Sequence, residues 1–197
     1  MINFKKMSKK NNKIKKNFWQ IFYAILAALV IRSFLYEPFS IPSGSMYPNL
    51  KVGDYLFVSK FSYGFSRNSL PFSLPLIPGR IFYKEPKRGD VVVFKTPEDN
   101  RTDYIKRLIG LPGDKISMQS NQIFINGKKI QSELINNENY KSFDVQKIKE
   151  TLPNQKSYSV YEFEKTFSVY NTNNFDEIIV PEDSFFVIGD NRDNSQD

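Results

Sequence analysis

The sequence predicts a mainly β protein: an N-terminal transmembrane helix, then an antiparallel-sheet domain with an inserted β-rich subdomain. One apolar segment near the N-terminus is as long as a membrane span. Beyond it, short runs rich in Val, Ile, Phe and Tyr are separated by Gly, Pro, Asn and Asp, which is typical of strands joined by turns. The polar stretch 131–176 shows no sustained helical period.

The composition excludes several kinds of site. The 197 residues contain no His and no Cys, so this chain cannot build a Ser-His-Asp triad, a Cys-His pair, a zinc finger or a His-ligated metal. We expect no metal and no cofactor. A nucleophilic serine would need Lys, Asp, Glu or an amine as its base.

The net charge of +7 is concentrated at the N-terminus. Seven of the 28 Lys and Arg residues lie in 1–17, which contain no acid, and the remaining 21 balance the 21 Asp and Glu residues. A neutral domain with a basic tail lacks the charge of a nucleic-acid-binding domain, so we expect no nucleic-acid partner.

Residues 18–36 form the predicted anchor. Nineteen residues rise about 28 Å as a helix, close to the thickness of a bilayer core. Arg32 can extend to the interface, where Trp19, Tyr23 and Tyr36 are also favourable. A signal-peptide core or a buried helix is the alternative, but no small-x-small cleavage site follows. The lysines predict a cytoplasmic N-terminus, with the rest of the chain across the membrane.

Short strands follow along the chain. An Asn-Gly turn in 123–130 is the strongest hairpin signal. Three prolines exclude a regular element from 70–78, which is either a loop on the core or an apolar surface on lipid. The other strands are expected at 55–59, after a turn within 87–94, at 103–109 and at 185–188, with further β structure in 131–176.

Two candidate functional residues are far apart in the sequence. Ser45 lies in Ser-Gly-Ser within 41–48, a pattern that also occurs in ordinary turns, and at most roughly 30 Å of chain separates it from the anchor. Alternation places Lys106 between Tyr104 and Leu108, where desolvation would favour the neutral amine that a base requires. The alternative for Lys106 is a solvated surface charge.

The last residues form a loop dense in Gly, Asp and Asn. One interpretation is a surface turn. Another is a calcium loop, because Asp193, Ser195 and Asp197 alternate as oxygen ligands do.

Five ordered motifs together resemble bacterial type I signal peptidases (leader peptidases, peptidase family S26), the membrane-anchored Ser-Lys endopeptidases that remove signal peptides from exported proteins. The motifs are Pro42–Pro48, Gly53–Asp54, Arg88–Phe94, Tyr104–Asp114 and Gly189–Ser195. The resemblance covers about 18–115 and 180–197 and implies the signal peptidase/LexA-like β fold.

The resemblance implies a division of the chain. It comprises a cytoplasmic basic tail (1–17), a transmembrane anchor (18–36), a catalytic domain (37–115 and 180–197) and an inserted non-catalytic subdomain (116–179). The family usually continues beyond the position of Asp197 with Ser-Arg and a final strand, so we expect the catalytic domain to be C-terminally incomplete here.

The resemblance also implies residue roles. Ser45 would be the nucleophile and Lys106 the general base, while the Ser45 amide and the Ser43 hydroxyl would form the oxyanion hole and Ser195 would orient Lys106. Small apolar pockets would select Ala-x-Ala in a peptide bound as an added strand. The implied pocket residues, which could also be core residues, are Phe39, Ile41, Met46, Leu50, Tyr104 and Ile105.

The expected partners are signal peptides of exported preproteins and the lipid bilayer. The expected location is the bacterial inner (cytoplasmic) membrane, with a single pass, a cytoplasmic N-terminus and the catalytic domain on the outer (periplasmic) side. Two alternatives remain: a catalytically silent, membrane-tethered β domain that binds peptides, and a Ser-Lys self-cleaving regulator of related fold.

Overall fold

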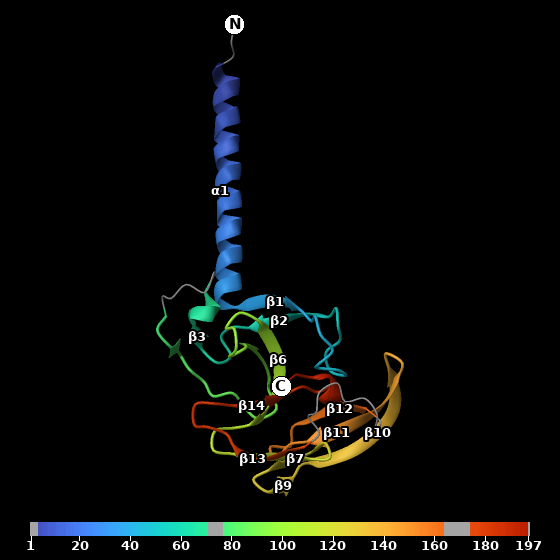
Figure 1. Ribbon diagram of the computed structural model, residues 1–197. Helices are drawn as coiled ribbons and strands as arrows, with labels where there is room; N and C mark the ends of the chain where they lie inside the picture. Colours follow the sequence, from blue (N-terminus) through green and yellow to red (C-terminus); the bar gives the residue numbers. More distant parts are fainter. Residues whose placement is uncertain (1–3, 71–76, 164–173, 197) are drawn as a thin grey trace. The chain divides into compact units, whose positions relative to one another are not determined.

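The computed structural model describes residues 4–70, 77–163 and 174–196. One long N-terminal helix is followed by antiparallel strands (Figure 1), which confirms the mainly β class. The chain forms two compact units. The first contains Met1–Phe39 and Phe57–Glu85, and the second contains Ser40–Leu56 and Pro86–Asp197.

Helix α1 spans Phe4–Phe34, so it begins within the lysine-rich segment and ends two residues before the predicted end of the anchor. Pro38 disfavours helix at the residue before it, and Tyr36–Ser40 instead form β1, which pairs with β2 (Tyr55–Ser59). Within α1, Lys15–Phe34 is long and apolar enough to cross a membrane by length and composition. It is compatible with membrane anchoring.

Polar contacts organise the first unit around Glu37. Its carboxylate pairs with Lys60 at 2.9 Å and with Arg32 at 3.5 Å. A short hairpin of β3 (Phe65–Ser66) and β4 (Arg80–Ile81) follows. Residues 71–76 lie outside the described residues, so the two interpretations of the 70–78 segment stay predictions.

Three sheets build the second unit (Figure 1). The first has the order β14-β6-β5, the second β13-β7-β8-β9 and the third β10-β11-β12. Their bounds are β5 Val91–Lys95, β6 Asp103–Gly110, β7 Lys115–Gln119, β8 Gln122–Ile125, β9 Lys128–Lys129, β10 Gln131–Tyr140, β11 Phe143–Thr151, β12 Ser157–Phe163, β13 Phe175–Ile179 and β14 Phe186–Ile188.

The predicted hairpin is confirmed. Strands β8 and β9 are joined by Asn126 and Gly127, both with positive φ (53° and 74°), as the tight turn of a two-residue hairpin requires. The Asn126 side chain donates to Asp114 at 2.9 Å, and Arg88 pairs with the same carboxylate at 2.8 Å. Two residues of the recognised motifs therefore stabilise this turn region.

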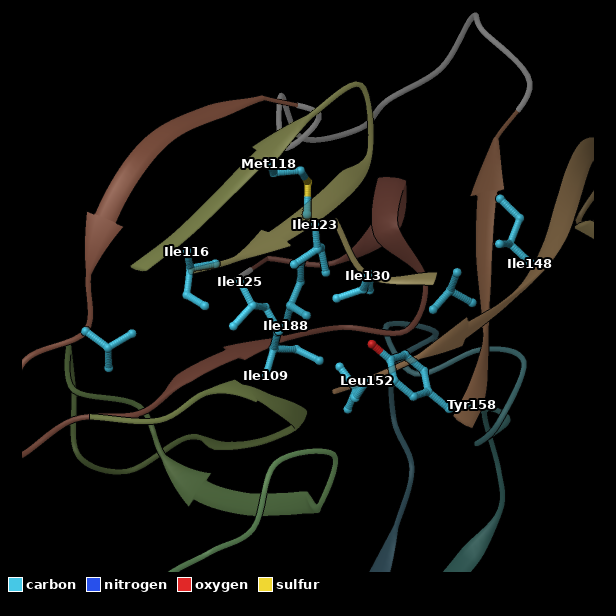
Figure 2. Close-up of a cluster of buried hydrophobic side chains, with 12 residues drawn as sticks. Ile109, Ile116, Met118, Ile123, Ile125, Ile130, Ile148, Leu152, Tyr158 and Ile188 are labelled. Carbon is cyan, nitrogen blue, oxygen red and sulfur yellow. The ribbon is translucent and has the colours of Figure 1, made fainter. Parts of the chain in front are cut away.

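The main core lies between these sheets. Apolar side chains from β6, β7, β8 and β14 point toward one another, together with side chains of the third sheet (Figure 2). Strand β6 is central, between β14 and β5, and it is buried on both faces from Lys106 to Gly110. Strand alternation assigns Lys106 and Leu108 to one face and Arg107 and Ile109 to the other, and all four residues are buried.

Candidate active site

A loop between β1 and β2 carries Ser43 and Ser45. Pro42 at its start and Pro48 near its end exclude a regular helix. The loop turns on itself through backbone hydrogen bonds such as Tyr47 N to Gly44 O at 3.2 Å. The two hydroxyl oxygens of Ser43 and Ser45 lie 3.3 Å apart, Ser45 being buried and Ser43 exposed.

The Gly53–Asp54 motif closes this loop. Gly53 N donates to Ile41 O at 3.0 Å, and Ile41 N donates to Asp54 O at 2.9 Å, so the two ends of the loop are joined. Gly53 has φ of +91°, a conformation that favours glycine. The motif thus has a structural role beside the serines.

Lys106 extends from β6 into a buried polar environment and is 3% exposed. Its Nζ donates to the Ser195 hydroxyl and to Gln196 O, the latter at 2.5 Å. Nζ also lies 5.5 Å from the centre of the Tyr104 ring. A buried amine with defined acceptors is held in one position.

Residues 189–195 connect Ser195 to the Ser45 loop. Asn191 donates from its backbone to Ser45 O at 2.9 Å and from Nδ2 to Gly44 O at 3.0 Å. A Cβ at Gly189 would overlap the Ser195 hydroxyl and lie 2.7 Å from Ser45 O, so only glycine fits there. The structure therefore joins Lys106 to Ser195, and the Ser195 segment to Ser45.

A buried ion pair, absent from the sequence-based prediction, lies beneath this region. Arg107 makes two hydrogen bonds of 2.7 Å to the Asp190 carboxylate, and its guanidinium carbon lies 4.2 Å from the Tyr158 ring centre. Asn49 of the Ser45 loop donates to the same carboxylate at 2.7 Å. Burial raises the pKa of Asp190, and the hydrogen bonds from Arg107 and Asn49 oppose that shift.

A second buried pair fixes the turn that precedes Ser195. Arg192 pairs with Glu150 of β11, both side chains being almost fully buried. The Asp193 carboxylate accepts a hydrogen bond from the Phe163 backbone amide at 2.8 Å. Burial raises the pKa of Asp193, whereas the hydrogen bond from Phe163 and the charge of Arg192 oppose this shift.

The structure leaves the calcium-loop interpretation a prediction. In residues 4–70, 77–163 and 174–196, no three carboxyl, imidazole or thiol groups cluster as metal ligands. Asp197, the third residue of that predicted loop, lies outside the described residues.

The predicted pocket residues differ in burial. Ile41 and Met46 are 3% and 0% exposed, as expected of core residues. Leu50, Tyr104 and Ile105 are half-buried and retain surface that a ligand can contact. Phe39, also half-buried, belongs to β1 in the first unit. The pocket assignment stays a prediction.

A family model and curated relatives identify one family. Residues 14–197 match the family model "Signal peptidase, peptidase S26". The signal peptidase I of Rickettsia akari (strain Hartford) is 46% identical over 96% of this chain and 74% of the relative. That of Rickettsia felis (strain ATCC VR-1525 / URRWXCal2) is 47% identical over 94% and 73%. The crystal structure of a signal peptidase I from Enterococcus faecalis V583 matches 58% of this chain and 84% of that chain, with 27% identity and a TM-score of 0.33.

Proposed function

The chain belongs to the signal peptidase family, peptidase S26, and we propose that it cleaves N-terminal signal peptides from exported preproteins with a Ser45–Lys106 dyad. The observation that carries this proposal is the buried Lys106 amine, which bonds to Ser195 within a segment that is itself hydrogen-bonded to the Ser45 loop.

In the proposed mechanism, neutral Lys106 accepts the Ser45 Oγ proton as the oxygen attacks the scissile carbonyl. Ser195 Oγ and Gln196 O both accept hydrogen bonds from Lys106 Nζ, and these bonds would hold the amine in place for this transfer. Protonated Lys106 next gives this proton to the departing amine of the mature protein. Water hydrolyses the acyl-enzyme with Lys106 again as base.

The negative charge on the substrate oxygen needs donors. The Ser45 amide and the Ser43 hydroxyl are the proposed pair, and the 3.3 Å separation of the two serine oxygens supports a shared site for them. Loss of one oxyanion donor costs an acyl-transfer enzyme about 10²–10³-fold in kcat.

The proposed specificity is for small residues in an Ala-x-Ala sequence before the cut. Shallow apolar pockets discriminate by size, so larger side chains would be excluded. The peptide would bind as an added strand, with Leu50, Tyr104 and Ile105 offering the half-buried surface near it.

The proposed location is the bacterial inner (cytoplasmic) membrane, crossed once by α1. The lysine-rich N-terminus would be cytoplasmic and the second unit periplasmic. This topology would bring Ser45 to the side on which exported preproteins emerge.

Cleavage of a signal-peptide substrate ending in Ala-x-Ala by the full chain in detergent tests the proposal. We expect cleavage after the second Ala, loss of activity in Ser45→Ala by more than about 10³-fold, and normal activity in Ser117→Ala of β7. Equal cleavage by Ser45→Ala would refute the assignment, and binding without cleavage would favour the silent peptide-binding domain.

A further inference from the structure

A small aromatic cluster separate from the main core lies behind the Ser45 loop. It consists of buried Tyr140, Val145 and Tyr161 with the partly buried Tyr47 and Phe163 packed against them. Tyr140 ends β10, Val145 belongs to β11, and Tyr161 and Phe163 belong to β12. The third sheet therefore supplies all of the aromatic cluster except Tyr47.

Tyr47 connects this cluster to the proposed nucleophile. It follows Ser45 by two residues in the same loop. Its ring centre lies 4.6 Å from that of Tyr140 and 6.3 Å from that of Tyr161, with which it is nearly parallel. Pairs at these distances are in contact, so the Ser45 loop packs directly on the third sheet.

The Tyr140 hydroxyl reaches the backbone of the loop. A Cβ added at Gly44 would overlap this hydroxyl, whereas its next neighbours, Asn194 Nδ2 and Tyr47 Cδ2, would lie at an ordinary 3.4 Å. The φ of Gly44 lies outside the left-handed region, so space alone excludes a side chain there. The hydroxyl oxygen of Tyr140 is therefore the atom that restricts residue 44 to glycine.

The Tyr140 hydroxyl makes no hydrogen bond within the described residues, although Tyr140 is only 7% exposed. Burying an unpaired hydroxyl costs stability. The hydroxyl occupies the space in which a Gly44 Cβ would lie, so it sterically limits how far the Gly44 backbone can move toward the sheet.

Two contacts therefore hold the peptide that precedes Ser45. Asn191 binds Gly44 O at 3.0 Å, and the Tyr140 side chain closes the space beside the Gly44 Cα. This peptide carries the Ser45 N–H, the proposed oxyanion donor. Small displacements of such a donor reduce transition-state stabilisation more than substrate binding.

We propose that Tyr140 is a positioning residue of the reaction, through which the third sheet sets the position of the Gly44–Ser45 peptide. The inference rests on the proposed function. It assigns a role in catalysis to a sheet that carries none of the motifs of the family.

A size-compensation experiment tests it, with kcat, KM and the melting temperature measured for each variant in detergent. We expect Gly44→Ala to lower kcat by about 30-fold or more with KM changed less than about 3-fold. Tyr140→Phe alone removes the oxygen that limits the movement of Gly44, so it should lower kcat by about 3-fold or more with KM nearly unchanged. The double variant Gly44→Ala/Tyr140→Phe should regain at least about 10-fold in kcat, because the overlapping oxygen is gone.

Tyr158 provides the matched control, since it is another tyrosine of the third sheet that is 7% exposed. Gly44→Ala/Tyr158→Phe should recover nothing. The inference would be overturned if Tyr140→Phe and Tyr158→Phe restored the kcat of Gly44→Ala equally. It would also be overturned if the effects of Gly44→Ala and Tyr140→Phe on kcat were simply additive, or if Gly44→Ala did not lower kcat. If Gly44→Ala does not fold, Tyr140→Leu tests the positioning role instead. An unchanged kcat of Tyr140→Leu would overturn that role, and a reduced kcat with unchanged KM would support it.

The unaltered chain and Ser45→Ala are assayed in the same series. If the unaltered chain does not cleave, or Ser45→Ala does, the proposed function itself fails. If both behave as expected and the Tyr140 variants do not, only the positioning role fails.

Discussion

Ser195 is the residue on which the orientation of Lys106 depends most directly. Its hydroxyl accepts a hydrogen bond from Lys106 Nζ, as the neighbouring Gln196 O does, so removing the hydroxyl takes away one of the contacts that hold the amine. We therefore expect Ser195→Ala to lower kcat by about 10²-fold and to leave KM nearly unchanged. Steady-state cleavage rates beside Ser117→Ala measure this, and a loss seen only in KM would contradict the orienting role.

Glu162 should make stability depend on pH. Burial raises its pKa from 4.5 to about 7; Arg192 and Asn121 oppose the shift, while Glu150 and Asp193 add to it. Between these two values the folded state binds more protons than the unfolded state. The contribution of Glu162 to stability is therefore full below about pH 4.5 and is lost as pH rises to about 7.

Replacing Glu162 with Gln should remove this dependence. We expect the free energy of unfolding of Glu162→Gln to fall less steeply between pH 5 and 7, the difference in slope being at most about 1.4 kcal/mol per pH unit. Glu133→Gln, at an exposed position of β10, is the matched control. Identical slopes for Glu162→Gln and the unaltered chain would show that Glu162 titrates normally.

Strand β11 and the turn before Ser195 depend on each other through Glu150 and Arg192. Glu150→Leu leaves a fully buried guanidinium without its carboxylate partner, and we expect a loss of about 3–5 kcal/mol in the free energy of unfolding. Glu177→Leu breaks an exposed pair with Lys115 and should cost less than about 1 kcal/mol. Chemical denaturation measures both, and equal losses would contradict the importance of burial.

The strands themselves follow closely from local sequence. The hairpin at Asn126 and Gly127, and strands β2, β6 and β14, form within one or two residues of their expected positions because turn chemistry and apolar runs are local signals. The helix start was less predictable, since lysines favour helix as well as a flexible tail. Burial of Arg107 was not predictable, because its partner Asp190 is 83 residues away.

The candidate site also combines residues that motifs point to and contacts that the sequence does not predict. Motifs point to Ser45, Lys106 and Ser195. The structure places Lys106 Nζ in a hydrogen bond with the Ser195 hydroxyl, and the roles of the three residues stay predictions. The contacts of Tyr140 and Glu150 with the motif segments carry no local signal. They arise from the pairing of strands in a region without a recognised motif, so only the tertiary structure reveals them.

The whole molecule combines an apolar N-terminal helix with antiparallel sheets. Apolar side chains along 18–34 of α1 are largely exposed, which is unfavourable in water and favourable in lipid. We expect Leu26→Arg/Val30→Arg to weaken membrane insertion, because each central Arg costs about 2.5–3.5 kcal/mol. Alkaline extraction of membranes should release this variant but retain Lys15→Arg/Lys16→Arg. Equal retention would argue against a spanning helix.

The cleavage rate of Lys106→Met tests the Ser-Lys mechanism most directly. Methionine has a similar length but no basic nitrogen, and Lys115→Met, on an exposed strand position, controls for the loss of a charge. We expect Lys106→Met to remain folded and to lose more than about 10³-fold in kcat at every pH, with Lys115→Met unaffected. A folded Lys106→Met that still cleaves the signal peptide at the normal rate would contradict the mechanism.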